Sequence, residues 1–192
     1  MISVSVNSAE VQALARVLDG NAKEFRKQMA IAVNKVAGNA QKQIAKEVGK
    51  EIATPQKVIK TTISVKRAKV GVSPTATVTQ KKTSRISLRE FGAKQNKQGT
   101  TYKISKKGGR SLVAGAFQGP KPGVINVRTR GHVFKRTGKE RLPIQKLMGP
   151  SPWGVTVKNK IDEVVVKFSR ADLLKQIKER TRFLGLKKSG AI

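Results

Sequence analysis

The chain has 192 residues, a length that suits one ordinary domain. Its 41 lysines and arginines outnumber 11 acidic residues, which gives a formal net charge of +30. The lack of cysteine excludes disulfides, thiolate metal sites and a cysteine nucleophile, and without a run of about 18 apolar residues we expect no membrane-spanning helix. Such an excess of positive charge predicts a polyanionic partner or neighbour.

The excess positive charge lies mainly in the middle of the chain. Residues 52–161 hold 25 basic residues against only Glu90 and Glu140, and so carry 23 of the 30 net charges. Residues 1–51 hold eight basic and five acidic residues, and residues 162–192 hold eight and four. We predict one structural domain made of three segments: an N-terminal helical segment (1–53), a basic β-rich core (54–158), and a C-terminal helix and tail (159–192).

Helical periodicity dominates the N-terminal segment. Apolar residues up to Leu18 predict a first short helix, and Asn21 can cap a second one, with Glu24 placed as in a capping box. The second helix is expected to run for about 28 residues, roughly 40 Å. Gly38 within it marks either a close packing contact or a mild weak point. One apolar stripe along this helix predicts packing on a core or on a neighbouring subunit: Ala22, Phe25, Met29, Val33, Val36, Ala40, Ile44 and Val48.

Short strands are predicted for the middle of the chain. Pro55 can occupy the first position of a short helix, and in the stretch that follows Ala76 and Val78 alternate with threonines as in a strand. Further strand candidates are "TYKISKK", "SLVAGAFQG", "HVFKRTG" and "WGVTVKN". Helical spacing returns from Ile161 onward. This order predicts an α+β fold: a long N-terminal helix packed on a small, mostly antiparallel β-sheet, plus a C-terminal helix.

Residues suited to catalysis are scarce. His132 is the only histidine, and its nearest acidic residue in sequence is Glu140. Asp162 and Glu163 are adjacent, so they point apart on a helix or a strand. The glycine-rich "GGRSLVAGAFQG" lacks the spacing of a phosphate-binding loop. We therefore predict no catalytic residue, no metal site and no cofactor, and a structural role for His132.

Cationic clusters in predicted loops are the candidates for contact with DNA or another polyanion. With so few aromatic residues and no recognisable reading motif, the charge suits contact with the nucleic-acid backbone better than sequence reading. The alternative, that many of these side chains face solvent or an acidic protein, stays open. The candidates are Lys81, Lys82, Arg85, Lys94, Lys97, Lys106, Lys107, Arg110, Arg128 and Arg130.

Three stretches, taken in order, form a recognisable combination. They are "AIAVNKVAGNAQKQIAKEVG" (30–49) with "PQKVIK" (55–60), "LREFGAKQNKQGTTYKISKKGGRSLVAGAFQG" (88–119), and "HVFKRTGKERLPIQKLMGPS" (132–151). Together they resemble the minor tail protein Z family of long-tailed bacteriophages, also described as tail completion proteins. The resemblance covers most of 25–155. Each stretch alone is a weak signal, and their combination is specific.

The resemblance implies a structural protein of the virion tail, made in the host cytoplasm and placed at the head-proximal end, where it supports head–tail joining and DNA passage. It implies a homo-oligomer, expected as a hexameric ring, with genomic DNA in its lumen. Its neighbours would be tail terminator, tail tube and neck proteins, and no membrane is involved. The alternative that the charge leaves open is a standalone basic nucleic-acid-binding protein.

The same motifs supply architectural candidates. We expect phenylalanine and leucine to pack, glycine to allow close backbone approach, and Pro143 and Pro150 to fix the direction of the chain. The residues are Phe91, Gly92, Gly115, Phe117, His132, Phe134, Leu142, Pro143, Leu147, Gly149 and Pro150.

Overall fold

The computed structural model describes residues 2–5, 22–70, 74–119 and 131–188. The chain forms two compact units, which are described separately. The helical unit comprises Met1–Ile44, Ile63–Gln80 and Lys160–Ile192, and the β-rich unit comprises Ala45–Thr62 and Lys81–Asn159. The predicted first helix, up to Leu18, lies outside the described residues. The division into segments 1–53, 54–158 and 159–192 stays a prediction.

The long helix α2 (Ala22–Glu51) confirms the predicted N-terminal helix. From Phe25 to Val48 every predicted stripe residue is at most 1 % exposed. The buried positions recur every three or four residues, which is the spacing of one helix face. Gly38 has no atom within 4 Å of the position that a Cβ would occupy, so it makes no close packing contact and is instead a weak point of the helix.

Three antiparallel strands form the sheet of the helical unit: β1 (Ile2–Ser5), β2 (Ile63–Lys66) and β3 (Thr75–Gln80). The order is β1-β3-β2, and Val78 of β3 pairs with Ile2 on one side and with Val65 on the other. Ala76 and Val78 are buried while Thr75 is exposed, as the alternation predicted. The buried face of β3 therefore belongs to the core of this unit.

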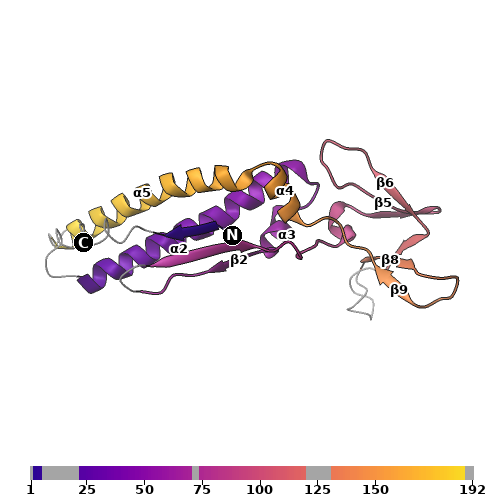
Figure 1. The fold of residues 1–192 in the computed structure, drawn as a ribbon, viewed down its shortest axis with the longest axis horizontal. Coiled ribbons are helices and arrows are strands. Elements are labelled where there is room, and N and C mark those ends of the chain that lie inside the picture. Colours follow the sequence, from indigo (N-terminus) through magenta and orange to yellow (C-terminus); the bar gives the residue numbers. More distant parts are fainter. Residues whose placement is uncertain (1, 6–21, 71–73, 120–130, 189–192) are drawn as a thin grey trace. The chain divides into compact units, whose positions relative to one another are not determined.

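The C-terminal helix α5 (Ile161–Lys188) and α2 lie side by side along this sheet (Figure 1). On α2, the Gln41 Nε2 atom donates to the Ile63 carbonyl of β2 at 2.9 Å. The Asn34 amide exchanges two hydrogen bonds with the Ala68 backbone, at 2.7 and 3.0 Å. α5 contacts β1, the opposite edge strand. The predicted packing of helices on a small antiparallel sheet, an α+β fold, is thereby confirmed.

The β-rich unit contains two further three-stranded antiparallel sheets, ordered β4-β5-β6 and β7-β8-β9. Isolated bridges pair Ile52 with Ser105 and Ser87 with Met148. The strands are β4 (Lys94–Asn96), β5 (Gly99–Tyr102), β6 (Ser111–Ala114), β7 (Ala116–Gln118), β8 (Val133–Arg136) and β9 (Ile144–Lys146). The helical elements are α3 (Gln56–Thr61), the 3-10 helix η1 (Leu88–Phe91) and α4 (Pro152–Lys158).

The strand expected at "TYKISKK" ends early, since β5 stops at Tyr102. Two further local predictions were wrong. "WGVTVKN" was expected as a strand but forms α4, because Ser151 caps the helix and Pro152 suits its first turn. The Ser151 Oγ atom accepts a hydrogen bond from the Trp153 backbone N–H at 3.3 Å. Pro55 precedes α3 as its N-cap residue instead of occupying the first helical position. Only at α4 does the side chain of the cap residue accept a hydrogen bond from the first turn.

Candidate polyanion-binding surface

The positive charge is concentrated in the β-rich unit. This unit has 23 lysines and arginines against four acidic residues, a net +19, whereas the helical unit has 18 against seven, a net +11. Two of the four acidic residues are already paired: Glu47 with Lys50 at 2.6 Å, and Glu90 with Arg89 at 3.9 Å. The internal anions of this unit are therefore too few to neutralise its cations.

The predicted cationic candidates fall at three places in the β-rich unit, and those that the structure describes are all exposed. The turn at 81–85 carries three, the β4–β5 hairpin two, and the β5–β6 connection three. Arg128 and Arg130 lie outside the described residues. The described candidates are Lys81, Lys82, Arg85, Lys94, Lys97, Lys106, Lys107 and Arg110.

The β4–β5 hairpin presents Lys97 at a tightly fixed turn. The Asn96 Oδ1 atom accepts hydrogen bonds from the backbone N–H groups of Gln98 and Gly99, at 3.1 and 2.9 Å. Gly99 has φ 155°, and a Cβ there would collide with the Val113 carbonyl of β6. The turn therefore needs glycine at this position, and it holds the Lys97 side chain in solvent.

Arg110 differs from the other candidates because its guanidinium is held by the protein. One of its nitrogens, Nη2, donates to the Gly92 carbonyl at 2.6 Å and to the Thr101 carbonyl at 3.1 Å. Arg110 thereby ties the end of η1 to β5 while its side chain stays exposed. Its predicted contact with a polyanion stays a prediction, and the structure gives it an internal role as well.

Sequence reasoning missed Trp153 as a neighbour of the cationic turn. The Lys82 Nζ atom lies 5.6 Å from the centre of the Trp153 ring. The Ser151 Oγ atom, which caps α4, also donates to the Lys81 carbonyl at 3.4 Å. The cap thus joins the start of α4 to the turn. A Ser-Pro pair before an apolar run was the signal for this helix, and the strand assignment of "WGVTVKN" concealed it.

The β8–β9 hairpin is a second cationic feature. Residues 135–143 are exposed without interruption, and the Thr137 backbone N–H closes the loop by donating to the Pro143 carbonyl at 3.2 Å. The guanidinium of Arg136 lies 5.2 Å from the centre of the Phe117 ring. The hairpin carries four exposed cations, for which the sequence left open a DNA or a protein partner: Lys135, Arg136, Lys139 and Arg141.

Both ring nitrogens of His132 are engaged. Nδ1 lies 3.0 Å from the Ser87 Oγ atom, and the Lys146 Nζ atom lies 3.2 Å from Nε2. Because a lysine ammonium can only donate, this network assigns the proton to Nδ1 and leaves Nε2 as the acceptor. Burial, followed by the positive charges of Lys146 and Arg89, lowers the pKa of His132, and the carboxylate of Glu90 opposes them only in part. The neutral form of the ring is therefore favoured.

Gly149 packs closely against Phe91, and both are among the predicted motif residues. Phe91 is fully buried, and a Cβ at position 149 would collide with its ring. The Gly149 backbone N–H donates to the Ile86 carbonyl at 2.7 Å, so the backbone has little freedom to move away. Gly92 and Gly115 have φ of 62° and 70°, a region that favours glycine.

The other motif residues occupy mixed environments. The rings of Phe117 and Phe134 pair across β7 and β8 with centres 6.1 Å apart, and the Leu147 backbone N–H donates to the Val133 carbonyl at 2.8 Å. Leu142 is 66 % exposed, and so it does not pack against the described part of this unit. Pro143 and Pro150 are also exposed. The architectural role of these exposed residues stays a prediction.

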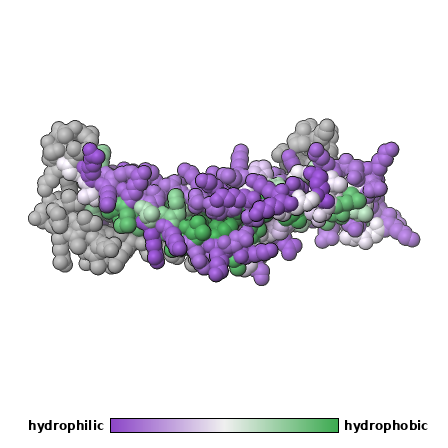
Figure 2. Space-filling view, turned by 90° about the horizontal axis from the view of Figure 1, so that it is seen from above, coloured by the Kyte–Doolittle hydropathy of each residue, from purple (hydrophilic) through white to green (hydrophobic). Residues whose placement is uncertain are grey.

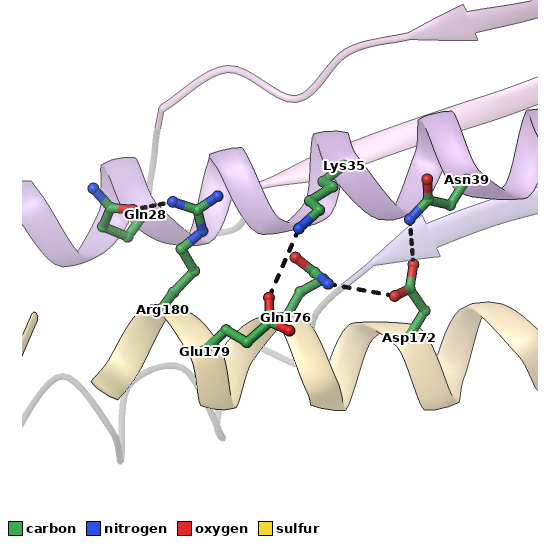
Figure 3. Close-up of polar contacts among 7 residues, drawn as sticks. All are labelled: Gln28, Lys35, Asn39, Asp172, Gln176, Glu179 and Arg180. Carbon is green, nitrogen blue, oxygen red and sulfur yellow. Dashed lines mark hydrogen bonds and ion pairs between the residues drawn. The ribbon is translucent and has the colours of Figure 1, made fainter. Parts of the chain in front are cut away.

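The helical unit arranges its charges differently (Figure 3). Across α2 and α5, Arg180 donates to the Gln28 Oε1 atom at 3.3 Å, Lys35 pairs with Glu179 at 3.7 Å, and Asn39 donates to Asp172 at 2.9 Å. The residue numbers rise on α2 as they fall on α5, so the two helices are antiparallel. We call these contacts, with Gln176, which donates to Asp172 at 3.5 Å, the interhelical ladder.

Within the described ranges, no group of three or more histidine or acidic residues is placed to hold a metal ion. Over the same ranges, every helix is too short or too polar to cross a lipid bilayer.

The fold and the exposed cations define a basic α+β protein whose positive charge is concentrated in a β-rich unit. The family model of prophage minor tail protein Z (GPZ) matches residues 10–185. The chain belongs to this family, as its sequence motifs predicted, and it is a minor tail protein of a phage tail. No curated protein and no solved structure shows significant similarity to the chain.

Proposed function

We propose that this minor tail protein is a structural component of the head-proximal end of the tail, where a ring of its copies supports head–tail joining and DNA passage. The family membership supports the tail location. The observation that carries the proposal is the concentration of exposed cations on the β-rich unit, which fits a surface that faces DNA in the lumen.

A ring would bring the positive charges of several copies close together. Six copies of a chain with a net charge of +30 would carry about +180 before counterions bind. Such an assembly requires DNA or strongly acidic neighbours close by. Genomic DNA in the lumen and acidic faces of the tail terminator, tail tube or neck proteins are the partners that the proposal names.

Exposed apolar side chains on α5 support contacts between copies. Val164, Phe168 and Leu174 are 48, 38 and 61 % exposed on this helix. Figure 2 shows hydrophobic side chains at the surface between rows of hydrophilic ones. Exposed apolar side chains can take part in protein–protein contacts, and a head-to-tail ring needs contact residues on each subunit.

The proposed role is structural and not catalytic. One ring nitrogen of the only histidine contacts Ser87 and the other contacts Lys146, and both contacts are consistent with a structural use of the ring. The engaged nitrogens support a role of His132 in holding β8 and β9 near Ser87.

The proposal is tested by measuring where this protein lies in the virion and how many copies are present there. A tagged chain should be detected at the head-proximal end of the tail by electron microscopy with a gold-labelled antibody, and native mass spectrometry of the isolated tail end should give six copies. Phage that lack the protein should accumulate tails that join heads poorly. A label at the distal tip would contradict the proposal, as would a purified chain that binds DNA as a monomer and is absent from virions. The second result would favour the standalone nucleic-acid-binding protein.

A further inference from the structure

A hollow of about 590 Å³ opens beside the cationic turn of the β-rich unit. Its lining combines the cations Lys82 and Arg85 with the indole ring of Trp153 and with Pro150 and Ser151. The hollow therefore presents positive charge next to an aromatic face.

Backbone and side-chain contacts hold this arrangement in place. The Ser151 hydroxyl donates to the Lys81 carbonyl at 3.4 Å and accepts from the Trp153 backbone N–H at 3.3 Å. The turn itself is closed by two backbone hydrogen bonds, from Ser84 to the Lys81 carbonyl at 3.2 Å and from Arg85 to the Thr83 carbonyl at 2.9 Å. Lys82, Arg85 and Trp153 thus converge on one hollow although the aromatic residue lies about 70 positions further along the chain.

We propose that this hollow binds single-stranded DNA, with one base stacked on Trp153 and the adjacent phosphates held by Lys82 and Arg85. Aromatic platforms flanked by cations are the general means by which proteins hold single strands. This inference rests on the proposed contact of the β-rich unit with DNA. It further specifies where the DNA binds and that the bound DNA is single-stranded.

The chemistry of the lining favours a single strand over the two other anionic partners. A duplex keeps its bases stacked inside the helix, so it would contact the lysine and arginine and leave the indole unused. An acidic peptide would likewise engage only the charges. In the present conformation the Lys82 ammonium lies over the indole face. Base stacking is the stronger of the two interactions at an exposed site, so a base displaces Lys82, which is then free to contact a phosphate.

Trp153 is the only tryptophan of the chain, so its fluorescence reports on this hollow alone. The full-length protein would be titrated with an eight-nucleotide oligothymidylate, with a duplex of the same length, and with an octaglutamate peptide. We expect saturable quenching by the oligothymidylate. The duplex should bind, as measured by anisotropy of a labelled strand, with little quenching, and the peptide should not quench.

Two double variants distinguish binding at this hollow from binding through the overall positive charge. Lys82→Ala with Arg85→Ala should weaken oligothymidylate binding about tenfold and lower its salt slope by about 1.4, since each single-strand phosphate contact contributes roughly 0.7. The matched control, Lys167→Ala with Arg170→Ala, removes a lysine and an arginine at the same spacing from exposed positions of α5, where no DNA contact is proposed. It should keep the full quenching amplitude.

Variants of Trp153 are measured by the binding of a labelled oligothymidylate, because they lack the tryptophan signal. Trp153→Ala should weaken this binding about fivefold or more, and Trp153→Phe, which keeps an aromatic ring, should bind nearly as well as the unaltered protein. Circular dichroism would verify that each variant is folded.

Each other outcome overturns the inference. Quenching by octaglutamate without quenching by oligothymidylate would assign the hollow to an acidic protein. Equal losses of oligothymidylate binding in the two double variants would show that overall charge, and not this hollow, accounts for the binding. Duplex binding without any oligothymidylate quenching would remove this inference and leave the DNA-facing proposal standing, whereas failure of both nucleic acids to bind would remove the two together.

Discussion

In the helical unit several charged and polar side chains of α2 pair with side chains of α5, whereas in the β-rich unit the cations greatly outnumber the acidic residues. Lys35 meets Glu179 and Asn39 meets Asp172 in the interhelical ladder. The β-rich unit has four acidic residues for 23 basic ones, and its interior depends on close contacts such as Gly149 against Phe91. The difference indicates that the helical unit uses some of its polar side chains to join its two helices, while the β-rich unit leaves most of its described cations exposed and without enough acidic residues to balance them.

The largest effect should come from the close contact in the β-rich unit. Gly149→Ala places a methyl group against the buried Phe91 ring, and the hydrogen bond to Ile86 restrains the backbone from shifting. We expect a loss of about 3 kcal/mol in the free energy of unfolding, measured by urea denaturation with Trp153 fluorescence. The control is Gly138→Ala, where the added Cβ meets no atom within 4 Å. Equal stability of the two variants would show that the contact is not tight.

A smaller effect should come from the interhelical ladder. Asp172→Ala removes the acceptor of Asn39 and Gln176 and leaves the Asn39 amide without this partner. The expected loss is about 1–2 kcal/mol in the free energy of unfolding, measured by far-ultraviolet circular dichroism, which reports mainly on the helices. Lys175→Ala on the same helix, where the side chain is exposed, serves as the control. If the two substitutions cost the same, the ladder contributes nothing beyond surface charge.

One substitution should strengthen the helical unit. Gly38→Ala adds a methyl group into open space in the middle of α2 and should stabilise the chain by about 0.5–1 kcal/mol. Gly49→Ala on the same helix is the matched comparison, since its Cβ would lie 3.3 Å from the Gln56 Cγ atom, and its gain should be smaller. Thermal unfolding followed by circular dichroism would check this order, and the reverse order would contradict it.

The smallest effect should be the pH dependence of the β-rich unit. The pKa of His132 is lowered in the folded chain, so below about pH 6.5 the unfolded state takes up the proton more readily. The free energy of unfolding should therefore decrease between pH 7.5 and 5.5. His132→Asn retains an N–H donor for Ser87 but cannot titrate, and its unfolding should depend less on pH. Identical pH profiles of the two proteins would exclude this contribution.

Sequence pattern predicted the parts of the fold that repeat over many residues. The stripe from Phe25 to Val48 was visible because burial on one face of a long helix imposes a regular spacing. The α4 helix has seven residues, too few for a period to emerge, and Val155 and Val157 within it imitate strand alternation. Only the cap formed by Ser151 distinguishes a helix from a strand in this segment.

The candidate site was predictable in composition but not in arrangement. The number and the order of the cations are properties of the sequence, and their exposure follows from the cost of burying unpaired charge. The approach of Trp153 to Lys82 depends on hydrogen bonds between residues far apart in the chain. The internal role of Arg110 likewise depends on two carbonyls that only the folded chain brings to it.

Salt dependence of duplex DNA binding tests most directly whether the β-rich unit is the DNA-facing part. One variant would replace four exposed lysines of this unit with alanine: Lys94, Lys97, Lys106 and Lys107. Its matched control would replace four exposed cations of α5: Lys167, Arg170, Lys175 and Lys178. Each phosphate contact contributes about 0.9 to the slope of log K against log salt, so the first variant should lose a slope of about 3 to 4 and the control almost none. Equal losses, or a larger loss in the α5 variant, would contradict the assignment.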